Sequence, residues 1–190
     1  MDEKLLHHIL GWGPPRRPDD NTSVGEAKRW LKDRLEDGTY CPCCDQFAKI
    51  YHRQIHASMA VHLIILYKLS GRTGEYIHKS VLMRQAKMSV SSFGGGDFAM
   101  LRFWGLIEEQ FKDLNKDSRT SGSWKITEKG ILFVDQRITV QQKVRIYNGG
   151  VLNFYGPMVS IVDCLHNKFS YADLMIGPVI RLAPTQPVLQ

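Results

Sequence analysis

Three cysteines within four positions, Cys41, Cys43 and Cys44, are the residues of this sequence best suited to chemistry. The spacing from Cys41 to Cys44 lets two thiolates reach one tetrahedral zinc ion. His52 and His56 follow at i, i+4 spacing, which suits a shared metal ion if that stretch is helical. The sequence therefore predicts a zinc site with the candidate ligands Cys41, Cys44, Cys43, His52 and His56.

Other interpretations of these cysteines stay open. In one, they are small hydrophobic residues buried in a tight turn. In another they form a redox pair, which is less favoured because no βαβ pattern surrounds them. Cys164 and His166 become further candidate ligands if the C-terminal part of the chain reaches this turn.

Residue patterns typical of enzymes are incomplete in this chain. The run Gly94-Gly95-Gly96 is not followed by the Lys-Ser/Thr pair of a phosphate-binding loop. Glu108 and Glu109 are neighbours in an expected strand, so their carboxylates point to opposite faces and cannot share a substrate. Cys164 and His166 lie on a short helix of mixed polarity, where such neighbours arise by chance. We therefore expect no enzymatic activity.

The composition is typical of a globular protein. The chain has 190 residues, of which 43% are hydrophobic and 23% charged, enough for one domain or two small ones. No apolar run approaches the roughly 18 residues that span a bilayer, and the acidic start Met1-Asp2-Glu3 is unlike a signal peptide. We expect a cytoplasmic protein with no membrane partner.

Most of the net charge of +6 lies in the middle of the chain. Between Asp45 and Val90, seven lysines or arginines stand against two acidic residues, a net charge of +5. Such a stretch suits contact with phosphates, although a solvated basic surface explains it nearly as well. Its candidate DNA contacts are Lys79, Arg84 and Lys87.

Capping residues and apolar spacing predict the helices. Ser23 and Glu26 form a capping box that opens the first helix, and Asp37-Gly38 ends it, since Gly38 suits a left-handed cap. Further helices are expected over residues 58–69 (apolar nearly all round), 75–87, 98–104 with Asp97 as cap, and 128–135 with Thr127 as cap. Ser160 and Ser170 are expected to cap two short helical segments near the end of the chain.

Strands are expected beside the turns. The cysteines occupy a tight turn over residues 40–46, and a strand over 47–51 leaves it. Strands over 106–111 and 123–126 flank a long polar loop. Asn148-Gly149-Gly150 between β-forming residues predicts a hairpin of 144–147 with 151–154.

The order of elements from Ser58 to Asp135 resembles a winged-helix domain of the MarR kind. Two segments carry this resemblance, residues 97–108 (DFAMLRFWGLIE) and 121–134 (SGSWKITEKGILFV). In that family the third helix ends at a Gly-Leu-Ile sequence, a hairpin wing follows, and its returning strand meets a Thr-x-x-Gly helix start, here Thr127 to Gly130. The whole chain, with its CPCC turn, winged helix and small hairpin, also resembles uncharacterised proteins of phage genomes.

The resemblance implies DNA contacts from the third helix and the wing. The start of that helix, residues 94–98, offers no Arg, Asn or Gln to read a base edge, and Asp97 would repel phosphate. The wing suits phosphate contact better, although its Asp113 and Asp117 also fit a solvated loop. The candidate contacts here are Arg102, Lys112, Lys116, Arg119 and Lys125. Trp104 and Trp124 are expected to face the same core, where the third helix meets the wing strands.

These patterns predict an α+β protein with a winged helix-turn-helix core, a CxxC-bearing N-terminal segment and a C-terminal β-hairpin unit. The expected parts are an extended N-terminal arm (1–22), a helix plus CPCC segment (23–57), a winged-helix domain (58–137), a β-hairpin with short helices (138–176) and a flexible tail (177–190). The predicted function is non-enzymatic, DNA-associated transcription regulation, with double-stranded DNA as partner and zinc as cofactor. The alternative is a protein-binding accessory or inhibitor module, in the host cytoplasm if phage-encoded.

Overall fold

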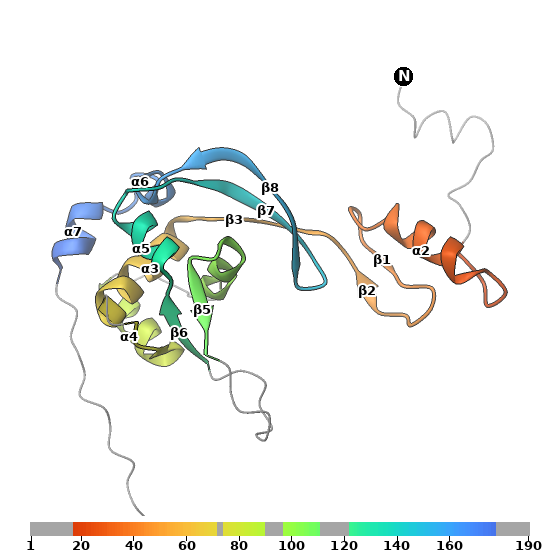
Figure 1. Cartoon of the computed structure of the whole chain (residues 1–190), viewed down its shortest axis with the longest axis horizontal. Helices are drawn as coiled ribbons and strands as arrows, with labels where there is room; N and C mark the ends of the chain where they lie inside the picture. The colour runs from red at the N-terminus through yellow and green to blue at the C-terminus, as the bar shows by residue number, and fades with distance from the viewer. Residues whose placement is uncertain (1–16, 72–73, 90–96, 111–121, 178–190) are drawn as a thin grey trace, which may run out of the picture. The chain divides into compact units, whose positions relative to one another are not determined.

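The computed structural model describes residues 17–71, 74–89, 97–110 and 122–177 (Figure 1). The chain is a mixed α+β protein, as predicted, and its strands form three small sheets. It divides into a smaller unit, Met1–Tyr51 with Ile146–Gly149, and a larger unit, His52–Arg145 with Gly150–Gln190. No helix among the described residues combines the length and the apolar character needed to cross a membrane. The predicted arm and tail fall largely outside the described residues.

The smaller unit begins with helix α2, Val24–Lys32. The predicted capping box is confirmed, because the Glu26 N–H donates to Ser23 Oγ at 3.3 Å and the Ser23 N–H donates to the Glu26 carboxylate at 3.2 Å. The α-helix ends at Lys32, earlier than expected, and the chain continues in turns before Gly38 takes a left-handed φ of +89°. A Cβ on Gly38 would lie 2.7 Å from the Phe47 ring, so a larger residue here would also require that ring to shift.

The cysteine turn joins two short antiparallel strands, β1 (Thr39–Tyr40) and β2 (Phe47–Ala48). The strand expected over 47–51 is interrupted, and a separate strand β3 (Tyr51–Gln54) follows. The interruption has a local cause, since Ile50 is buried and its N–H donates to the Leu35 carbonyl at 2.7 Å. Ile50 therefore turns toward the segment that follows α2 instead of extending β2.

Helix α3 (Ala57–Ser70) is the centre of the larger unit. The prediction of a buried helix is confirmed, because Leu63, Ile64 and Leu66 are fully buried and apolar residues surround the axis. Lys68 lies near the C-terminal end of α3, and its ammonium group donates to the carbonyls of Leu174 (2.7 Å) and Gly177.

A three-stranded antiparallel sheet with the order β4-β6-β5 packs beside α3. Its strands are β4 (Ile77–His78), β5 (Ile107–Glu109) and β6 (Ser123–Ile126). The helix expected over 75–87 was wrong at its start, because Ile77 pairs with Trp124 and helix α4 begins only at Lys79 and runs to Ser89. Pairing with a strand distant in sequence overrides the local helical pattern here.

The predicted third helix is a 3₁₀ helix, η2 (Phe98–Trp104). Its buried residues Phe98, Leu101 and Trp104 recur every three positions, which matches the three residues per turn of a 3₁₀ helix. Asp97 occupies the predicted N-cap position, but its side chain makes no cap hydrogen bond, and its carboxylate instead lies 3.5 Å from His56 Nε2.

Trp104 and Trp124 are both buried, as predicted, but their ring contacts differ. The Trp124 ring packs edge-on against Phe98, with centroids 5.5 Å apart. The Trp104 ring lies 6.3 Å from that of Phe154, and its indole N–H donates to the Gln141 carbonyl at 2.7 Å. Trp104 therefore ties η2 to the C-terminal hairpin.

The remaining elements follow the predicted capping signals. Helix α5 (Glu128–Val134) is capped by Thr127, whose Oγ1 accepts from the Gly130 N–H at 3.0 Å. The predicted hairpin is longer than expected, with β7 (Val140–Tyr147) and β8 (Gly150–Val159) joined through Asn148 and Gly149, both at positive φ. The order of this sheet is β3-β7-β8. Helices α6 (Ile161–Leu165) and α7 (Tyr171–Ile176) begin after Ser160 and Ser170, as expected.

Candidate functional site

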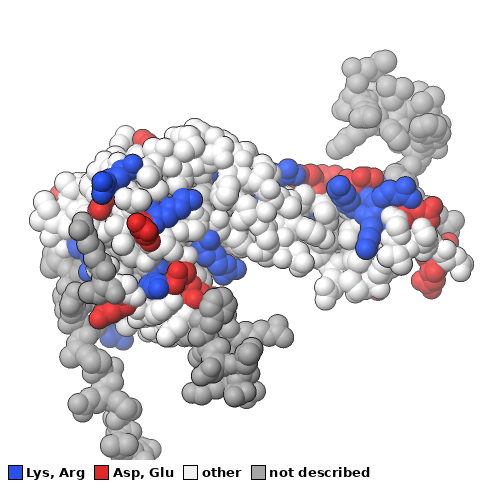
Figure 2. Space-filling model, in the orientation of Figure 1, with Lys and Arg blue, Asp and Glu red and all other residues white. Residues whose placement is uncertain are grey.

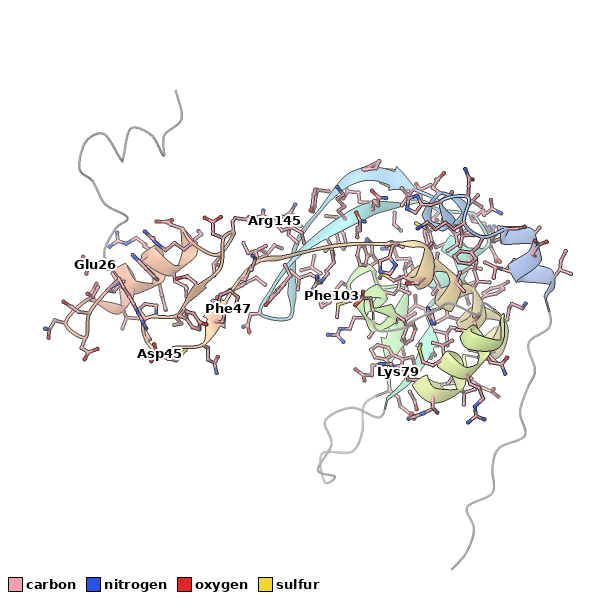
Figure 3. All side chains as sticks on the ribbon, turned by 180° about the vertical axis from the view of Figure 1, so that it is seen from behind. Glu26, Asp45, Phe47, Lys79, Phe103 and Arg145 are labelled. Atoms are coloured by element: carbon pink, nitrogen blue, oxygen red, sulfur yellow. The ribbon has the colours of Figure 1, made fainter. Side chains whose placement is uncertain are left out.

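One end of the β4-β6-β5 sheet holds a predicted DNA contact beside the start of strand β6. His78 pairs with Ser123 at the start of β6, and the Lys79 N–H donates to the Gly122 carbonyl at 2.8 Å. This hydrogen bond fixes the first residue of α4 at the end of the sheet where the connection between β5 and β6 rejoins it. The Lys79 side chain is exposed there and is labelled in Figure 3.

The other predicted DNA contacts are distributed over several elements. Arg84 is exposed on α4, and Arg102 is exposed on η2, where its guanidinium lies 4.9 Å from the centroid of the Phe103 ring. The side chains of Lys87, Lys112, Lys116 and Arg119 lie outside the described residues. On the face of the larger unit seen in Figure 2, lysines and arginines are interspersed with acidic residues instead of forming a continuous basic surface.

Lys125 is engaged within the sheet, which weakens its case as a DNA contact. Its ammonium group donates to the Glu108 carboxylate at 2.8 Å across the β5–β6 pair and lies 4.9 Å from the centroid of the Tyr76 ring. The Tyr76 hydroxyl donates to the same carboxylate at 2.8 Å. The hydrogen bond from Lys125 lowers the pKa of Glu108, and the hydrogen bond to Glu108 raises the pKa of Lys125. Contact with a phosphate would have to displace this pair.

The exposed side of η2 offers little for reading bases. Phe98, Leu101 and Trp104 are buried. Arg102 is the one charged residue of this helix. Seven residues at the 3₁₀ rise of about 2 Å each span roughly 14 Å, and no Asn or Gln is among them. Direct recognition of a base sequence by η2 is therefore unsupported by its side chains.

The cysteine turn is the second cluster of chemical interest. The Cys41 N–H donates to the Gln46 carbonyl at 2.8 Å, and the Asp45 N–H donates to the Cys41 carbonyl at 3.0 Å, which closes the turn between β1 and β2. Backbone hydrogen bonds from Cys43 and Cys44 to the Cys41 sulfur lower the pKa of the Cys41 thiol, and the two neighbouring thiols add smaller effects. Cys43 and Cys44 are exposed and Cys41 is half-buried.

The two histidines predicted as zinc ligands do not have the helical geometry that the prediction required. His52 lies in strand β3 with its Nδ1 2.7 Å from the Tyr155 hydroxyl, and His56 precedes α3 with its Nδ1 2.9 Å from the Ser58 hydroxyl. The reason is that β3 belongs to the sheet with β7, so the i, i+4 pair straddles a strand end and a helix start. Across the described residues, no three His, Cys, Asp or Glu side chains are grouped to hold a metal ion.

Cys164 is fully buried on α6, and burial raises the pKa of its thiol to about 12, with the Asp163 carboxylate adding to the effect. A thiol with a raised pKa stays protonated near pH 7 and reacts slowly with alkylating agents. We therefore expect Cys164 to resist iodoacetamide in the folded, chelator-treated protein while Cys43 and Cys44 are modified. Mass spectrometry of the native and the urea-unfolded protein measures this directly. Equal labelling of all four cysteines in the native state would contradict the buried position.

Sequence reasoning missed an open apolar groove of about 250 Å³. It is lined by Trp104, Lys129, Thr139, Val140, Gln141, Phe154 and Met158. Met158 lies in β8, an edge strand that also exposes Val151 and Leu152. The Asn-Gly turn signal between β-forming residues predicted the strand, but not that apolar side chains would remain exposed on it.

Comparison with protein-family models, with curated proteins and with solved structures found no significant match.

Proposed function

We propose that this chain is a non-enzymatic, DNA-associated regulatory protein that contacts double-stranded DNA through a winged-helix-like part of its larger unit. The element order α3, β4, α4, η2, β5, β6 and α5 supports this proposal, because three helical segments precede a hairpin and a capped helix follows it. Strand β4, which directly precedes α4, pairs with β6 and so links α4 to the sheet formed by β5 and β6.

The hydrogen bond from the Lys79 N–H to the Gly122 carbonyl carries the proposal. It brings an exposed lysine to the base of a connection whose sequence contains Lys112, Lys116 and Arg119. Cations near one end of one sheet can contact successive phosphates of a DNA backbone. Since η2 lacks base-reading side chains, the binding is expected to depend on phosphates more than on sequence.

A salt titration of binding to a labelled random-sequence duplex tests the proposal. Each phosphate that a lysine or arginine neutralises adds about −0.9 to the slope of log Kobs against log salt concentration. We expect Lys79→Ala, and separately Lys116→Ala with Arg119→Ala, to make that slope shallower by about one for each cation–phosphate pair that the substitution removes. Thermal stability should change little, because exposed charges contribute little to folding.

Lys168→Ala is the matched control, since Lys168 is an exposed lysine between α6 and α7, away from the β4-β6-β5 sheet. It should leave the slope unchanged. Wild-type protein that does not bind the duplex at low salt, or a slope that Lys79→Ala leaves unaltered, would rule out this interface.

The exposed edge of β8 favours a protein-binding module as the second candidate function. An edge strand leaves backbone N–H and C=O groups free to pair with an extended peptide, and neighbouring apolar side chains can add specificity. Val151, Leu152 and Met158 are 40%, 50% and 57% exposed, and the apolar groove lies beside Met158. If the salt titration shows no salt-dependent DNA binding, a protein-binding module becomes the favoured function.

A further inference from the structure

Strand β8 is the outer strand of the β3-β7-β8 sheet and carries no charged side chain along its ten residues (Figure 1). Proteins commonly protect the edges of their sheets with charges, prolines or bulges, which prevent pairing with a further strand. The opposite edge of the same sheet follows this rule, because β3 carries Arg53. The two edges of one sheet therefore differ, and only β8 has the composition of a strand that pairs on both sides.

The protective features that β8 does have lie toward its C-terminal end. Gly156 has a positive φ of 83°, which interrupts the extended backbone, and Pro157 has no backbone N–H to donate. The segment Gly150–Tyr155 precedes both, and its residues keep negative φ values. This segment has the usual length of a strand in globular proteins, about five or six residues. It is therefore a regular stretch of edge strand with a defined end.

The side chains of this segment are largely apolar. Since side chains alternate between the two faces of a strand, Leu152 and Phe154 share one face, and Val151 and Tyr155 share the other. Phe154 packs against the buried Trp104, with ring centroids 6.3 Å apart. Leu152 and Val151 remain 50% and 40% exposed. Covering these two side chains would favour association, because burial of apolar surface is stabilising.

We infer that Gly150–Tyr155 pairs antiparallel with the same segment of a second copy of this chain. The two three-stranded sheets then join into one sheet of six strands. The two-fold axis of the dimer passes beside Asn153. In this register Leu152 lies opposite Phe154 of the second copy, and Val151 lies opposite Tyr155. Apolar and aromatic side chains that face each other across two strands stabilise the pairing. The inference does not depend on DNA binding.

A second copy suits this edge because the segment is compatible with itself. A two-fold axis places a residue close to its own copy, so a charge near the axis would face a like charge and destabilise the pair. Asn153 is uncharged, whereas the same operation on β3 would bring two copies of Arg53 together. Each chain also carries a net charge of +6, so two copies approach with the least repulsion where the surface is uncharged.

Sedimentation velocity of the reduced, full-length protein over a range of concentrations tests the inference. Wild type should show a reversible monomer–dimer equilibrium that added EDTA leaves unchanged, because neither a disulfide nor a metal ion joins the chains. Hydrogen exchange followed by mass spectrometry locates the contact. Exchange of the backbone amides in residues 150–155 should slow as the protein concentration rises, while exchange in residues 52–54 of β3 should stay the same.

Two matched variants each place a lysine at an exposed apolar position. Leu152→Lys should abolish the dimer, because it sets an ammonium group opposite the Phe154 ring of the second copy. Ile176→Lys should leave the dimer intact, since Ile176 is 84% exposed on α7. Thermal melting followed by circular dichroism shows whether each variant is folded. The concentration series of wild-type protein decides the matter even if Leu152→Lys fails to fold.

Wild-type protein that sediments as a monomer throughout the concentration series would overturn the inference. The edge of β8 would then remain for the extended peptide of the second candidate function, or for another segment of this chain. A dimer that Leu152→Lys leaves intact, or one that EDTA dissociates, would overturn it as well. So would a dimer in which exchange of residues 150–155 does not slow.

Discussion

Trp104→Ala is expected to destabilise the larger unit by about 3–5 kcal/mol, the usual range for removing a buried aromatic side chain. Trp104 is 2% exposed, its ring contacts that of Phe154, and its indole N–H satisfies the Gln141 carbonyl at 2.7 Å. The alanine variant loses the ring and leaves this carbonyl without its donor. Because a domain has roughly 5–15 kcal/mol in total, the variant should melt many degrees lower or fail to fold.

Two further variants separate the contributions of ring and hydrogen bond. Trp104→Phe keeps an aromatic ring but removes the N–H, so it should cost less than the alanine variant. Phe103→Ala is the control on the same helix, since Phe103 is partly exposed and should give a markedly smaller loss. Urea denaturation followed by circular dichroism measures all three. An alanine variant that melts within a degree or two of wild type would contradict the core position of Trp104.

Gly130→Ala is expected to be the second most damaging single change, costing about 3 kcal/mol or more. A Cβ at this position would lie 2.1 Å from the Leu106 carbonyl oxygen and 2.7 Å from Ile126 Cγ1. The Leu106 carbonyl cannot move away freely, because it accepts the Thr127 N–H at 3.1 Å. The glycine of the Thr-x-x-Gly sequence is thus required for the close approach of α5 to the segment that leads into β5.

Gly25→Ala is the control, because it also adds a methyl group to a helical glycine. The nearest atom to its new Cβ would be Ser23 Oγ at 3.9 Å, so the change should be neutral or stabilise α2 by up to about 1 kcal/mol. Denaturant titration of both variants gives the comparison. If Gly130→Ala were as stable as wild type, the packing of α5 against Leu106 would have to differ from this structure.

The parts of the fold that local chemistry determines could be predicted from the sequence. Ser23, Thr127 and Ser160 each supply a side-chain acceptor to a first helical turn, and such caps act within three or four residues. Asn148 and Gly149 adopt the positive φ values that their hairpin turn requires. These signals need no knowledge of distant contacts.

The features that could not be predicted depend on partners far away in the chain. Ile77 lies in a segment with a helical apolar pattern, yet it pairs with Trp124 in the sheet. The 3₁₀ form of η2 follows from what Phe98 and Trp104 pack against, and the sequence does not reveal those partners. Local periodicity cannot distinguish such cases, because the competing energy comes from tertiary packing.

In the candidate sites, too, the features that depend on nearby residues could be predicted and those that depend on distant residues could not. The cysteine spacing identified the turn and its thiols from sequence alone. The engagement of Lys125 with Glu108 could not be predicted, because it requires the register of β5 against β6. The separation of His52 from His56 by a strand end was equally hidden, since β3 exists only through its pairing with β7.

That pairing has a consequence for how the chain folds as it is synthesised. Strand β3 is made about 90 residues before β7, its partner in the sheet. At about 5–20 residues per second, the ribosome takes roughly 5 to 20 seconds to supply the partner. During that interval Tyr51–Gln54 is a strand-forming segment with unpaired backbone groups, a condition that favours aggregation. Three of its four side chains, those of His52, Arg53 and Gln54, are polar. We therefore expect this segment to aggregate less readily before β7 is made than an apolar strand would.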